Sequence, residues 1–482
     1  MKNLKKTLLL VIAVCLSGYC LAQDTLLLAH DEFLAVVRNY HPLAFRYQLQ
    51  NRIAADEIQK ARGNFDPLAS AKNGAKTIDG LNYYKETHVE LGIPTWYGIE
   101  LNGNYNYIDG QKLNNSVTKG GLFQFGITLP LAKNLLYDKR RALLDQARFG
   151  LQMTEAEQQV LTNQLMLDAE NIYWEWVKQY EIYQLQSRTV AVNQQRLQLT
   201  QKTLEYGERA AIDTTEALSQ LQSFELQLQE AYLKFVKATQ ELSLFMWTKD
   251  RAPYELSSAV APAENLIENN AYENYSVLLT ALESRPLNQH AAVQYYTRKQ
   301  RVLESERRLK QQSLLPKLDF TYNFFNKEQY KADYLPLFQN NYQYGLKLEI
   351  PLLLREARAD YRIAKSKIEQ NQLDTDYKQQ ELNTKIITYR NEVINYRNQI
   401  DIAQQNIINY RRLLTAEETR FGNGESSLFL INTRENKLLE TEQKLIELRL
   451  KFVNSYNRLK WLNENFNNPV ASTRQLSPAG LR

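Results

Sequence analysis

The sequence predicts a mainly α-helical chain that adds membrane strands, and three observations carry this prediction. Two stretches without proline, about 138–205 and 355–420, could each form a helix about 100 Å long at 1.5 Å per residue. Short segments such as GGLFQFGITLPL at 120–131 alternate large apolar with small or polar residues, with the period of two that is typical of strands. Part of the chain is also repeated, which indicates an internal duplication.

Residues 1–22 have the composition of an export signal. Three lysines precede an apolar run, and small residues follow. We expect cleavage near Ala22; Cys20 could instead carry a lipid anchor, but the bulky Tyr19 stands where such sites prefer a small residue. Cys15 and Cys20 are the two cysteines of the sequence, so we expect a mature protein without a thiol or a disulfide.

Charge and hydropathy limit the possible partners. The chain has 59 Lys and Arg against 54 Asp and Glu, and three of the lysines lie in the signal. The mature chain is therefore nearly neutral, which argues against a nucleic-acid partner. Beyond the signal no run of 18 apolar residues occurs, so we expect any membrane crossing to be made by strands.

The duplication is visible as a shared pattern at two positions. Gly207 and Glu208 precede LKFV at 233–236, and Gly424 and Glu425 precede LKFV at 450–453 with the same spacing. Apolar residues continue at heptad spacing around both LKFV segments. The pattern therefore predicts, in each copy, a long helix, a glycine-containing turn and a helix of about half the length. The heptad spacing predicts that the shorter helices pack side by side against other helices.

Strands are predicted between the half-length helix and the long helix of each copy. The second copy alternates at 318–324 and 342–350 and predicts one hairpin; the first predicts four strands at about 65–77, 89–93, 97–107 and 120–130. Strands of about ten residues with aromatic ends fit a tilted bilayer crossing better than a soluble sheet. Six strands cannot close a membrane barrel, so several copies would share one.

These patterns predict nine segments. They are a signal peptide at 1–22, an N-terminal segment and helix at 23–64, barrel strands at 65–131, a helical hairpin at 132–248, a mixed equatorial segment at 249–286, a helix at 287–315, a barrel hairpin at 316–352, a second helical hairpin at 353–465 and a flexible tail at 466–482.

This order of elements resembles the TolC-like outer-membrane efflux proteins. The resemblance includes LPKL at 315–318, which opens a strand, TLPL at 128–131 and EIPL at 349–352, which close strands, and RFGNG at 420–424 before the last helix. It implies a homotrimer whose strands share one outer-membrane barrel in contact with outer-membrane lipid. It also implies a periplasmic α-barrel whose tips meet a periplasmic adaptor protein and an inner-membrane pump.

The resemblance implies a passive duct of a tripartite efflux or type I secretion system, gated at its periplasmic tips, with drugs, metals or proteins as cargo. The family's usual barrel has 12 strands. The additional hairpin of this chain would give about 18, unless residues 80–107 fold elsewhere. Members of the family also carry acidic residues after the second tip turn, where this chain has Ser427 and Thr433. Glu425 and Asp213 are weaker substitutes, and we expect charge changes at Glu425 to alter leak through the closed tip.

Two groups of residues are the predicted sites. The tip and adaptor contact consists of Tyr206, Gly207, Glu208, Asp213, Phe421, Gly422, Asn423, Gly424 and Glu425. The pore lining consists of Glu100, Asn102, Asn104, Gln124, Thr128, Asp319, Thr321, Asn323, Lys347 and Glu349. The tip glycines permit a left-handed backbone, and Asp213, Ser426 and Ser427 are placed to cap the returning helices.

Other sites are not predicted. The four histidines share no metal-ligand spacing, and no phosphate-binding loop or catalytic motif occurs, so we expect no enzyme activity, metal or cofactor. Lys139, Arg140 and Arg141 could contact lipid phosphates or simply solubilise a helix start. The aromatic residues between 173 and 180 favour interhelical packing over a ligand site. The alternative function is a periplasmic coiled-coil scaffold without channel activity.

Overall fold

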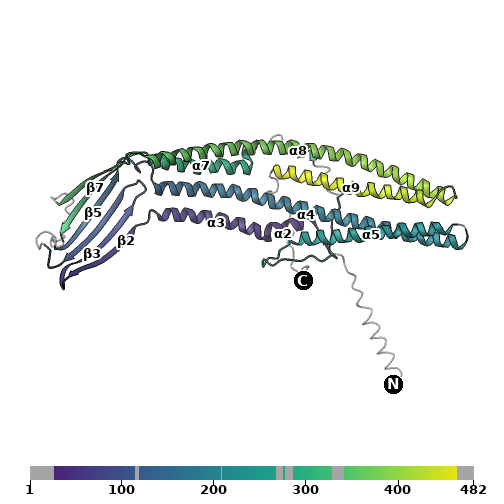
Figure 1. Ribbon diagram of the computed structural model, residues 1–482, viewed down its shortest axis with the longest axis horizontal. Helices are drawn as coiled ribbons and strands as arrows, with labels where there is room; N and C mark the ends of the chain where they lie inside the picture. The colour runs from purple at the N-terminus through teal and green to yellow at the C-terminus, as the bar shows by residue number, and fades with distance from the viewer. Residues whose placement is uncertain are drawn as a thin grey trace, which may run out of the picture. The chain divides into compact units, whose positions relative to one another are not determined.

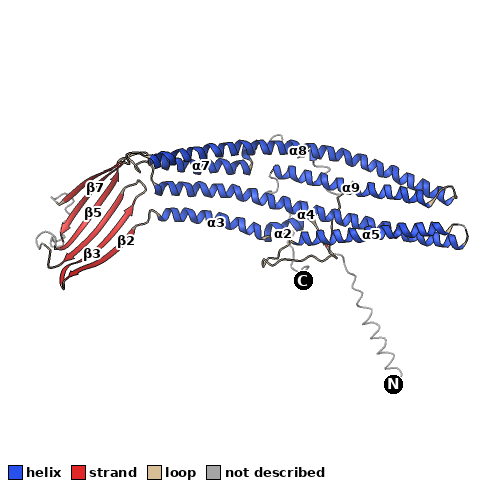
Figure 2. Ribbon diagram, viewed as in Figure 1, coloured by secondary structure: helices blue, strands red, loops and turns tan. Residues whose placement is uncertain are grey.

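The computed structural model describes residues 26–113, 119–207, 209–266, 275–276, 286–327 and 341–463. The predicted signal, its cleavage site and the tail at 466–482 lie outside these residues. The chain divides into two compact units: Met1–Phe45, Asn163–Ser284 and Ile386–Arg482 form one, and Arg46–Thr162 and Arg285–Lys385 form the other. We call them the hairpin unit and the sheet unit. Figure 2 distinguishes their helices from the strands, and both long helices run from one unit into the other.

No helix within the described residues is both long enough and apolar enough to cross a membrane.

The sheet unit contains one antiparallel sheet of six strands in the order β2-β3-β4-β5-β7-β8 (Figure 1). Their bounds are Leu68–Ile78, Leu81–Pro94, Glu100–Asp109, Gly120–Pro130, Lys317–Lys327 and Tyr342–Glu349. Six strands were predicted, four in the first copy and two in the second, and this is confirmed. Residues 80–107, whose place was left open, belong to the turn before β3, to β3 and β4, and to the turn between them.

Two turns in the first copy show why the strands begin where they do. Asp79 and Gly80 have φ values of 52° and 77° and join β2 to β3 directly, as a two-residue hairpin requires. The predicted start of β4 at Tyr97 was wrong. Gly98, at φ 82°, donates its N–H to the Thr95 carbonyl, and the Thr95 N–H donates to the Ile99 carbonyl. Residues 95–99 therefore form a turn, and β4 begins only at Glu100.

Four helical segments accompany the sheet in this unit. They are α3 (Pro42–Gly63) from Arg46 onward, the start of α4 (Lys139–Glu205), α7 (Ala291–Gln312) and the start of α8 (Arg355–Gly422). Lys310 of α7 lies 2.5 Å from Asp360 of α8, and Asn371 of α8 donates to the Tyr296 carbonyl of α7. The helices of the second copy are therefore joined along their length.

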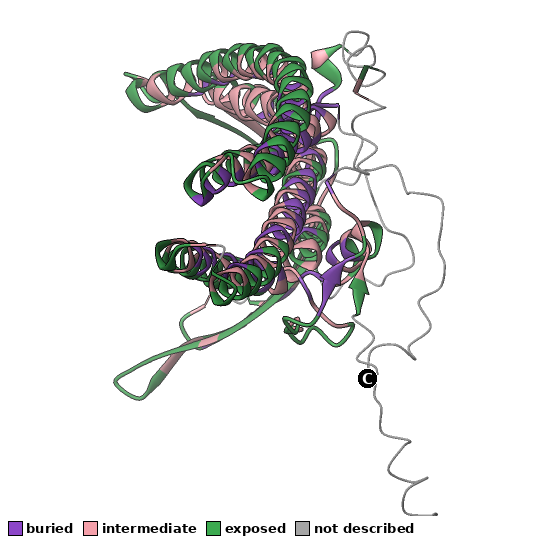
Figure 3. Cartoon of the chain, turned by 90° about the vertical axis from the view of Figure 1, so that its right-hand side faces the viewer, coloured by how far each residue is buried: buried purple, intermediate pink, exposed green. Residues whose placement is uncertain are grey.

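The hairpin unit contains the second part of both long helices and the two shorter helices that follow them. These are α5 (Ala211–Ser243) after α4 and α9 (Leu428–Leu462) after α8. Each pair runs side by side to a turn in Figure 1. Trp176 of α4 stacks on Phe235 of α5, and the buried Ser455 of α9 donates to Glu392 of α8. Buried residues recur along α5 and α9, as the heptad spacing predicted. Figure 3 colours the buried residues of the chain purple.

The two copies have matching elements. α4 and α8 contain 67 and 68 residues, α5 and α9 contain 33 and 35, and α3 and α7 contain 22 each. Phe235 and Phe452, the phenylalanines of the two LKFV segments, are both buried. The long proline-free helices predicted from the sequence are confirmed.

The N-terminal strand β1 (Leu27–Leu28) pairs in parallel with β6 (Ala261–Pro262), a short strand in the predicted equatorial segment. Helix α2 (His30–Tyr40) follows, and Phe33 and Val37 are its buried residues. Leu266 donates its backbone N–H to the Glu181 carboxylate of α4 at 2.6 Å. The described part of the equatorial segment is therefore attached to α4, and a 3₁₀ turn, η1 (Leu287–Gln289), precedes α7 in the sheet unit.

Candidate channel wall and helix tips

The register of the sheet places every predicted pore-lining residue on one face. Residues that are paired in antiparallel strands share a face, and alternate positions along each strand do too. Glu100, Thr128 and Thr321 form one row across β4, β5 and β7. The other seven fall in neighbouring rows of the same face: Asn102 with Asn323 through Gly126, Asn104 with Gln124, Asp319 with Lys347, and Glu349 with Lys317. We call this the polar face.

The opposite face carries most of the large apolar side chains, although Leu68, Leu122 and Phe325 lie on the polar face. Leu91, Phe125, Phe324 and Tyr342 lie in one row of this face, with Gly103 between Leu91 and Phe125. Phe125 is 55% exposed although it lies in the middle of its strand. Leu91 and Tyr342 of this row are also exposed, and Phe324 is partly buried. We call this the apolar face, and its exposure is typical of a surface that meets lipid or another chain.

Gly126 shows that the polar face is closely packed. A Cβ at this position would lie 2.3 Å from the side-chain oxygen of Asn323 on β7. The absence of a side chain at Gly126 therefore gives Asn323 the space it occupies. His88 of β3 also lies on this face, where it hydrogen-bonds to Asn106 of β4. The sequence interpretation did not include His88, although its alternation with Val89 and Thr87 in the strand was visible.

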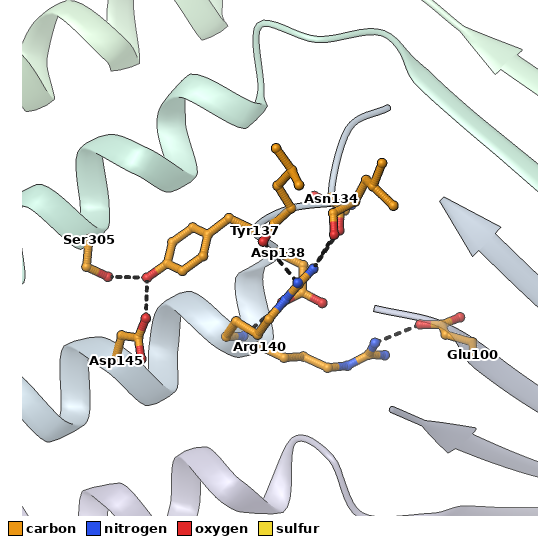
Figure 4. A network of polar contacts seen from close by, with 10 residues as sticks. Glu100, Asn134, Tyr137, Asp138, Arg140, Asp145 and Ser305 are labelled. Carbon is orange, nitrogen blue, oxygen red and sulfur yellow. Dashed lines mark hydrogen bonds and ion pairs between the residues drawn. The ribbon is translucent and has the colours of Figure 1, made fainter. Parts of the chain in front are cut away.

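A polar network ties the sheet to the start of α4 (Figure 4). Arg141 donates from its guanidinium to the backbone carbonyls of Asn134, Leu135 and Leu136 at 2.8 to 3.0 Å. Arg140 lies 2.8 Å from the carboxylate of Glu100 at the start of β4. Neither of the two roles proposed from the sequence describes Arg141, because its donors are taken by the connecting segment. The connecting segment forms neither a helix nor a strand of the sheet, so its carbonyls can accept these bonds. No sequence pattern predicts this.

The tip of α8 ends in a Schellman motif. Gly424 has φ 77° and donates to the Phe421 carbonyl, and Glu425 donates to the Arg420 carbonyl at 2.9 Å. The tip of α4 has the equivalent inner bond: Gly207 has φ 75° and donates to the Leu204 carbonyl. The predicted left-handed glycines are confirmed at both tips. Glu208 lies outside the described residues.

The predicted capping side chains are wrong. Ala210 and Ser427 are the N-cap residues of α5 and α9, and neither makes a side-chain capping bond. Ser426 donates to the buried Glu417 carboxylate at 2.6 Å instead. Asp213 lies in the first turn of α5, where its charge is favourable to the helix dipole although it does not cap. The tip turns are held by backbone bonds, so the hydroxyl groups are free for other partners.

The two tips contact each other through a residue that the sequence interpretation missed. The guanidinium of Arg209, after the first turn, lies 3.9 Å from the ring centroid of Phe421 in α8, and it also donates to the Phe421 carbonyl at 2.5 Å. Around this contact several predicted tip residues are exposed: Tyr206, Gly422, Asn423 and Glu425. The available signal was an arginine near each aromatic tip residue in the sequence: Arg209 three positions after Tyr206, and Arg420 directly before Phe421. Large apolar side chains, Ile212 and Phe429, are also exposed in the first turns of α5 and α9.

A buried ionic network lies elsewhere in the hairpin unit. Glu170 of α4 is 1% exposed, and its carboxylate lies 2.7 Å from His30 Nε2, 3.2 Å from Lys460 Nζ and 3.2 Å from Trp174 Nε1. Burial opposes the charge of Glu170, but His30 and Lys460 outweigh it and lower the pKa to about 2. Burial likewise opposes the charge of His30, but Glu170 and Asp31 raise its pKa to about 9.

The aromatic residues around this network pack between helices, as the sequence predicted. Tyr173 and Trp176 are fully buried, and Trp176 donates its indole N–H to Thr239 of α5. Within the described part of the chain, no group of three or more His, Cys, Asp or Glu is placed to hold a metal ion.

Comparison with known proteins finds a family model that matches part of the chain. Residues 280–462 match the family model described as outer membrane efflux protein. The predicted resemblance to outer-membrane efflux proteins is confirmed. The match covers α7, β7, β8, α8 and α9, which together are the second copy of the internal duplication.

Solved structures of outer-membrane proteins have the same fold over most of both chains. The CmeC outer membrane channel of Campylobacter jejuni is 13% identical, with a TM-score of 0.62 and coverage of 90% of this chain and 85% of that one. The outer membrane protein VceC of Vibrio cholerae is 13% identical, with a TM-score of 0.63 and coverage of 90% and 95%. The open state of the Neisseria gonorrhoeae MtrE outer membrane channel is 11% identical, with a TM-score of 0.62 and coverage of 90% and 88%. No curated protein shows a significant match.

Proposed function

We propose that the protein is the outer-membrane channel of a tripartite efflux or type I secretion system. It works as a homotrimer whose sheets form one shared barrel and whose helical hairpins form a tunnel in the periplasm. The separation of the sheet into an apolar and a polar face is the observation that carries this proposal. Such a sheet buries the apolar face in lipid and encloses water with the polar face, as a membrane barrel does.

The polar face determines what such a channel can do. The charged residues of this face include Glu100, Asp319, Lys347 and Glu349, so both signs of charge line the proposed pore. Mixed charges without a ring of one sign give weak ionic selectivity. The channel makes and breaks no bonds, and we assign it neither a catalytic residue nor a cofactor. Selection of cargo belongs to the pump rather than to this wall.

The tips are the proposed contact with a periplasmic adaptor protein. Tyr206 is 79% exposed, Ile212 is 72% exposed and Phe429 is 65% exposed, and all three lie at or beside the helix turns. Exposed aromatic and aliphatic side chains of this kind are enriched at protein contacts. The closed aperture is proposed at the same place, where Arg209 joins the two tips of one protomer.

Fractionation with matched variants tests the proposal. A channel remains in the outer-membrane fraction after a carbonate wash and migrates as a trimer in mild detergent, whereas the alternative coiled-coil scaffold washes off as a soluble protein. Deletion of the gene should raise the cellular accumulation of the cargo, and the intact chain should restore its export. A triple change of Tyr206, Ile212 and Phe429 to serine should abolish export without altering outer-membrane level. Equal export by that variant would contradict the tip contact, and loss of the protein from the membrane fraction would contradict the channel.

A further inference from the structure

The second tip carries an asparagine–glycine pair in an exposed turn. Asn423 and Gly424 follow Gly422, the last residue of α8, and all three residues are exposed. In an Asn–Gly pair the next backbone nitrogen can attack the side-chain amide, because glycine has no Cβ to hinder its approach. The sequence contains two other such pairs, Asn73–Gly74 in β2 and Asn102–Gly103 in β4, and both are held in the sheet.

The backbone of this turn does not require an asparagine. The shared spacing of the two copies places Tyr206 at the position of Asn423 and Gly207 at that of Gly424. The two glycines have φ values of 75° and 77°, and each donates to the carbonyl three residues before it. The same inner bond is therefore made after tyrosine in one copy and after asparagine in the other, so the turn does not depend on the side-chain amide of Asn423.

We propose that Asn423 is a site of spontaneous deamidation. The Gly424 backbone nitrogen attacks Cγ of Asn423, so that an N–Cγ bond forms and the bond from Cγ to the amide nitrogen breaks. The amide group leaves as ammonia and takes the proton of the Gly424 N–H with it. Water then opens the resulting succinimide at either carbonyl, which gives aspartate or isoaspartate. Water is the co-reactant, and no oxidation or reduction takes place.

The closed turn withholds the attacking nitrogen. The Gly424 N–H donates to the Phe421 carbonyl at 3.0 Å, and the Glu425 N–H donates to the Arg420 carbonyl at 2.9 Å. Arg209 of the other tip donates to the same Phe421 carbonyl. These bonds fix the backbone torsions, so the nitrogen reaches Cγ only while the turn is open. The rate of deamidation is therefore set by local opening of the second tip.

Both products loosen the turn in which they form. Aspartate places a carboxylate directly after the end of α8, where the helix dipole disfavours negative charge. The neighbouring Arg420 is already 3.7 Å from Glu417. Isoaspartate adds a carbon to the main chain, so the spacing that the Schellman bonds require is lost. Because ammonia is lost, the modification turns a transient opening of this tip into a lasting one, and Tyr206 of the first tip cannot react in this way.

Peptide mapping tests the site. The full chain, solubilised in mild detergent, would be incubated at neutral pH in heavy-oxygen water and digested with trypsin in ordinary water, so that deamidation during digestion carries no label. Cleavage after Arg420 and Arg434 releases residues 421–434. Asn423 should gain a labelled carboxylate with an isoaspartate fraction. Asn102 should gain several-fold less label, because β3 and β5 hold its strand from both sides. Asn423→Gln should abolish labelling of the tip peptide, since the larger ring closes far more slowly.

Variants outside the Asn–Gly pair test the dependence on opening. Arg209→Gln removes a donor to the Phe421 carbonyl and should speed deamidation several-fold, whereas Gly422→Ala stiffens the end of α8 and should slow it. Arg188→Gln removes the same charge elsewhere on α4 and should keep the natural rate. Absence of label at Asn423, or equal label at Asn423 and Asn102, overturns the site. Equal rates in Arg209→Gln and the natural chain overturn its coupling to opening.

Hydrogen exchange tests the consequence of the modification. Asn423→Asp reproduces one product and should speed exchange of the Glu425 amide several-fold, while Asn423→Gln should leave it unchanged. Unchanged exchange in Asn423→Asp overturns the loosening of the turn. The reaction does not require channel activity, so these measurements stand even if fractionation contradicts the proposed function.

Discussion

His30 at the start of α2 lies 2.7 Å from the buried carboxylate of Glu170, which is 140 residues away in α4. Lys460 near the end of α9 contacts the same carboxylate at 3.2 Å. Three segments of the hairpin unit, from the beginning, middle and end of the chain, therefore meet at one charge. A buried carboxylate is stable only with such partners, so this network holds the N-terminal segment and the last helix to α4.

Glu170→Gln should destabilise the hairpin unit more than a surface change would. The substitution leaves His30 and Lys460 beside a neutral amide, and breaking a buried ion pair by removing one partner costs about 3–5 kcal/mol. The melting temperature followed by tryptophan fluorescence measures this loss, because Trp174 donates to the same carboxylate. Glu175→Gln is the matched control, since Glu175 of α4 is more exposed and pairs with Lys178 on its own helix. Equal melting temperatures for the two variants would refute the role of Glu170.

The network should also make stability depend on pH. The pKa of His30 is raised from 6.5 to about 9 in the folded chain, so its contribution is fully present below pH 6.5 and is lost as pH rises through about 9. The pKa of Glu170 is lowered to about 2, so its contribution is present above pH 4.5 and is lost as pH falls toward 2. The melting-temperature difference between the natural chain and His30→Gln should therefore shrink from pH 6 to pH 10. A difference that stays constant over this range contradicts a charged His30.

The faces of the sheet could be predicted from sequence and the ionic network could not, for a physical reason. A strand fixes its faces by a local period of two, so Gln124 and Phe125 reveal their sides without knowledge of their neighbours. Glu170 is one of many acidic residues in a long helix, and its burial depends on His30 and Lys460, which the sequence places far away. The same applies to Ser426: its local position favours a cap, but the folded chain offers it Glu417.

A lysine at the centre of β5 should separate the two faces. Phe125→Lys puts a charge on the apolar face, where it costs about 2–4 kcal/mol at the middle of a bilayer. Gln124→Lys is the neighbouring control on the polar face, where the proposed pore supplies water. We expect several-fold less folded trimer in the outer membrane for Phe125→Lys and an unchanged amount for Gln124→Lys. An immunoblot of unheated samples measures the amount of folded trimer. Similar levels of the two variants would place the apolar face away from lipid.

Two glycines at the second tip, Gly422 and Gly424, should respond in opposite directions to the same change. Gly424 has φ 77°, so Gly424→Ala strains the backbone by about 1–2 kcal/mol although no atom lies within 4 Å of the new Cβ. Gly422 is the last residue of α8, and a Cβ there would also have no atom within 4 Å. Gly422→Ala should therefore stabilise the helix by about 0.5–1 kcal/mol. Hydrogen exchange of the Glu425 amide, which bonds to the Arg420 carbonyl, reports tip opening. Exchange should be faster in the first variant and slower in the second, and a change of the same sign in both would contradict the left-handed turn.

Removing Arg209 should loosen the contact between the two tips of a protomer. Arg209→Gln removes the cation–π contact of this partly buried arginine, worth about 0.5–2 kcal/mol, together with the bond to the Phe421 carbonyl. If the tips restrict the proposed aperture, single-channel conductance of the variant trimer in a planar bilayer should rise. Arg209→Lys should give an intermediate value, because an ammonium keeps the charge but lacks the planar stacking surface of a guanidinium.

The matched control for this variant is Arg188→Gln. Arg188 is exposed on α4 and donates to the Gln184 carbonyl of its own helix, so its loss removes the same charge without separating the tips. A rise in conductance limited to position 209 therefore identifies the contact with Phe421 as the cause. Equal rises in both variants would instead indicate that charge along the helices controls the current, because the tip contact is retained in Arg188→Gln.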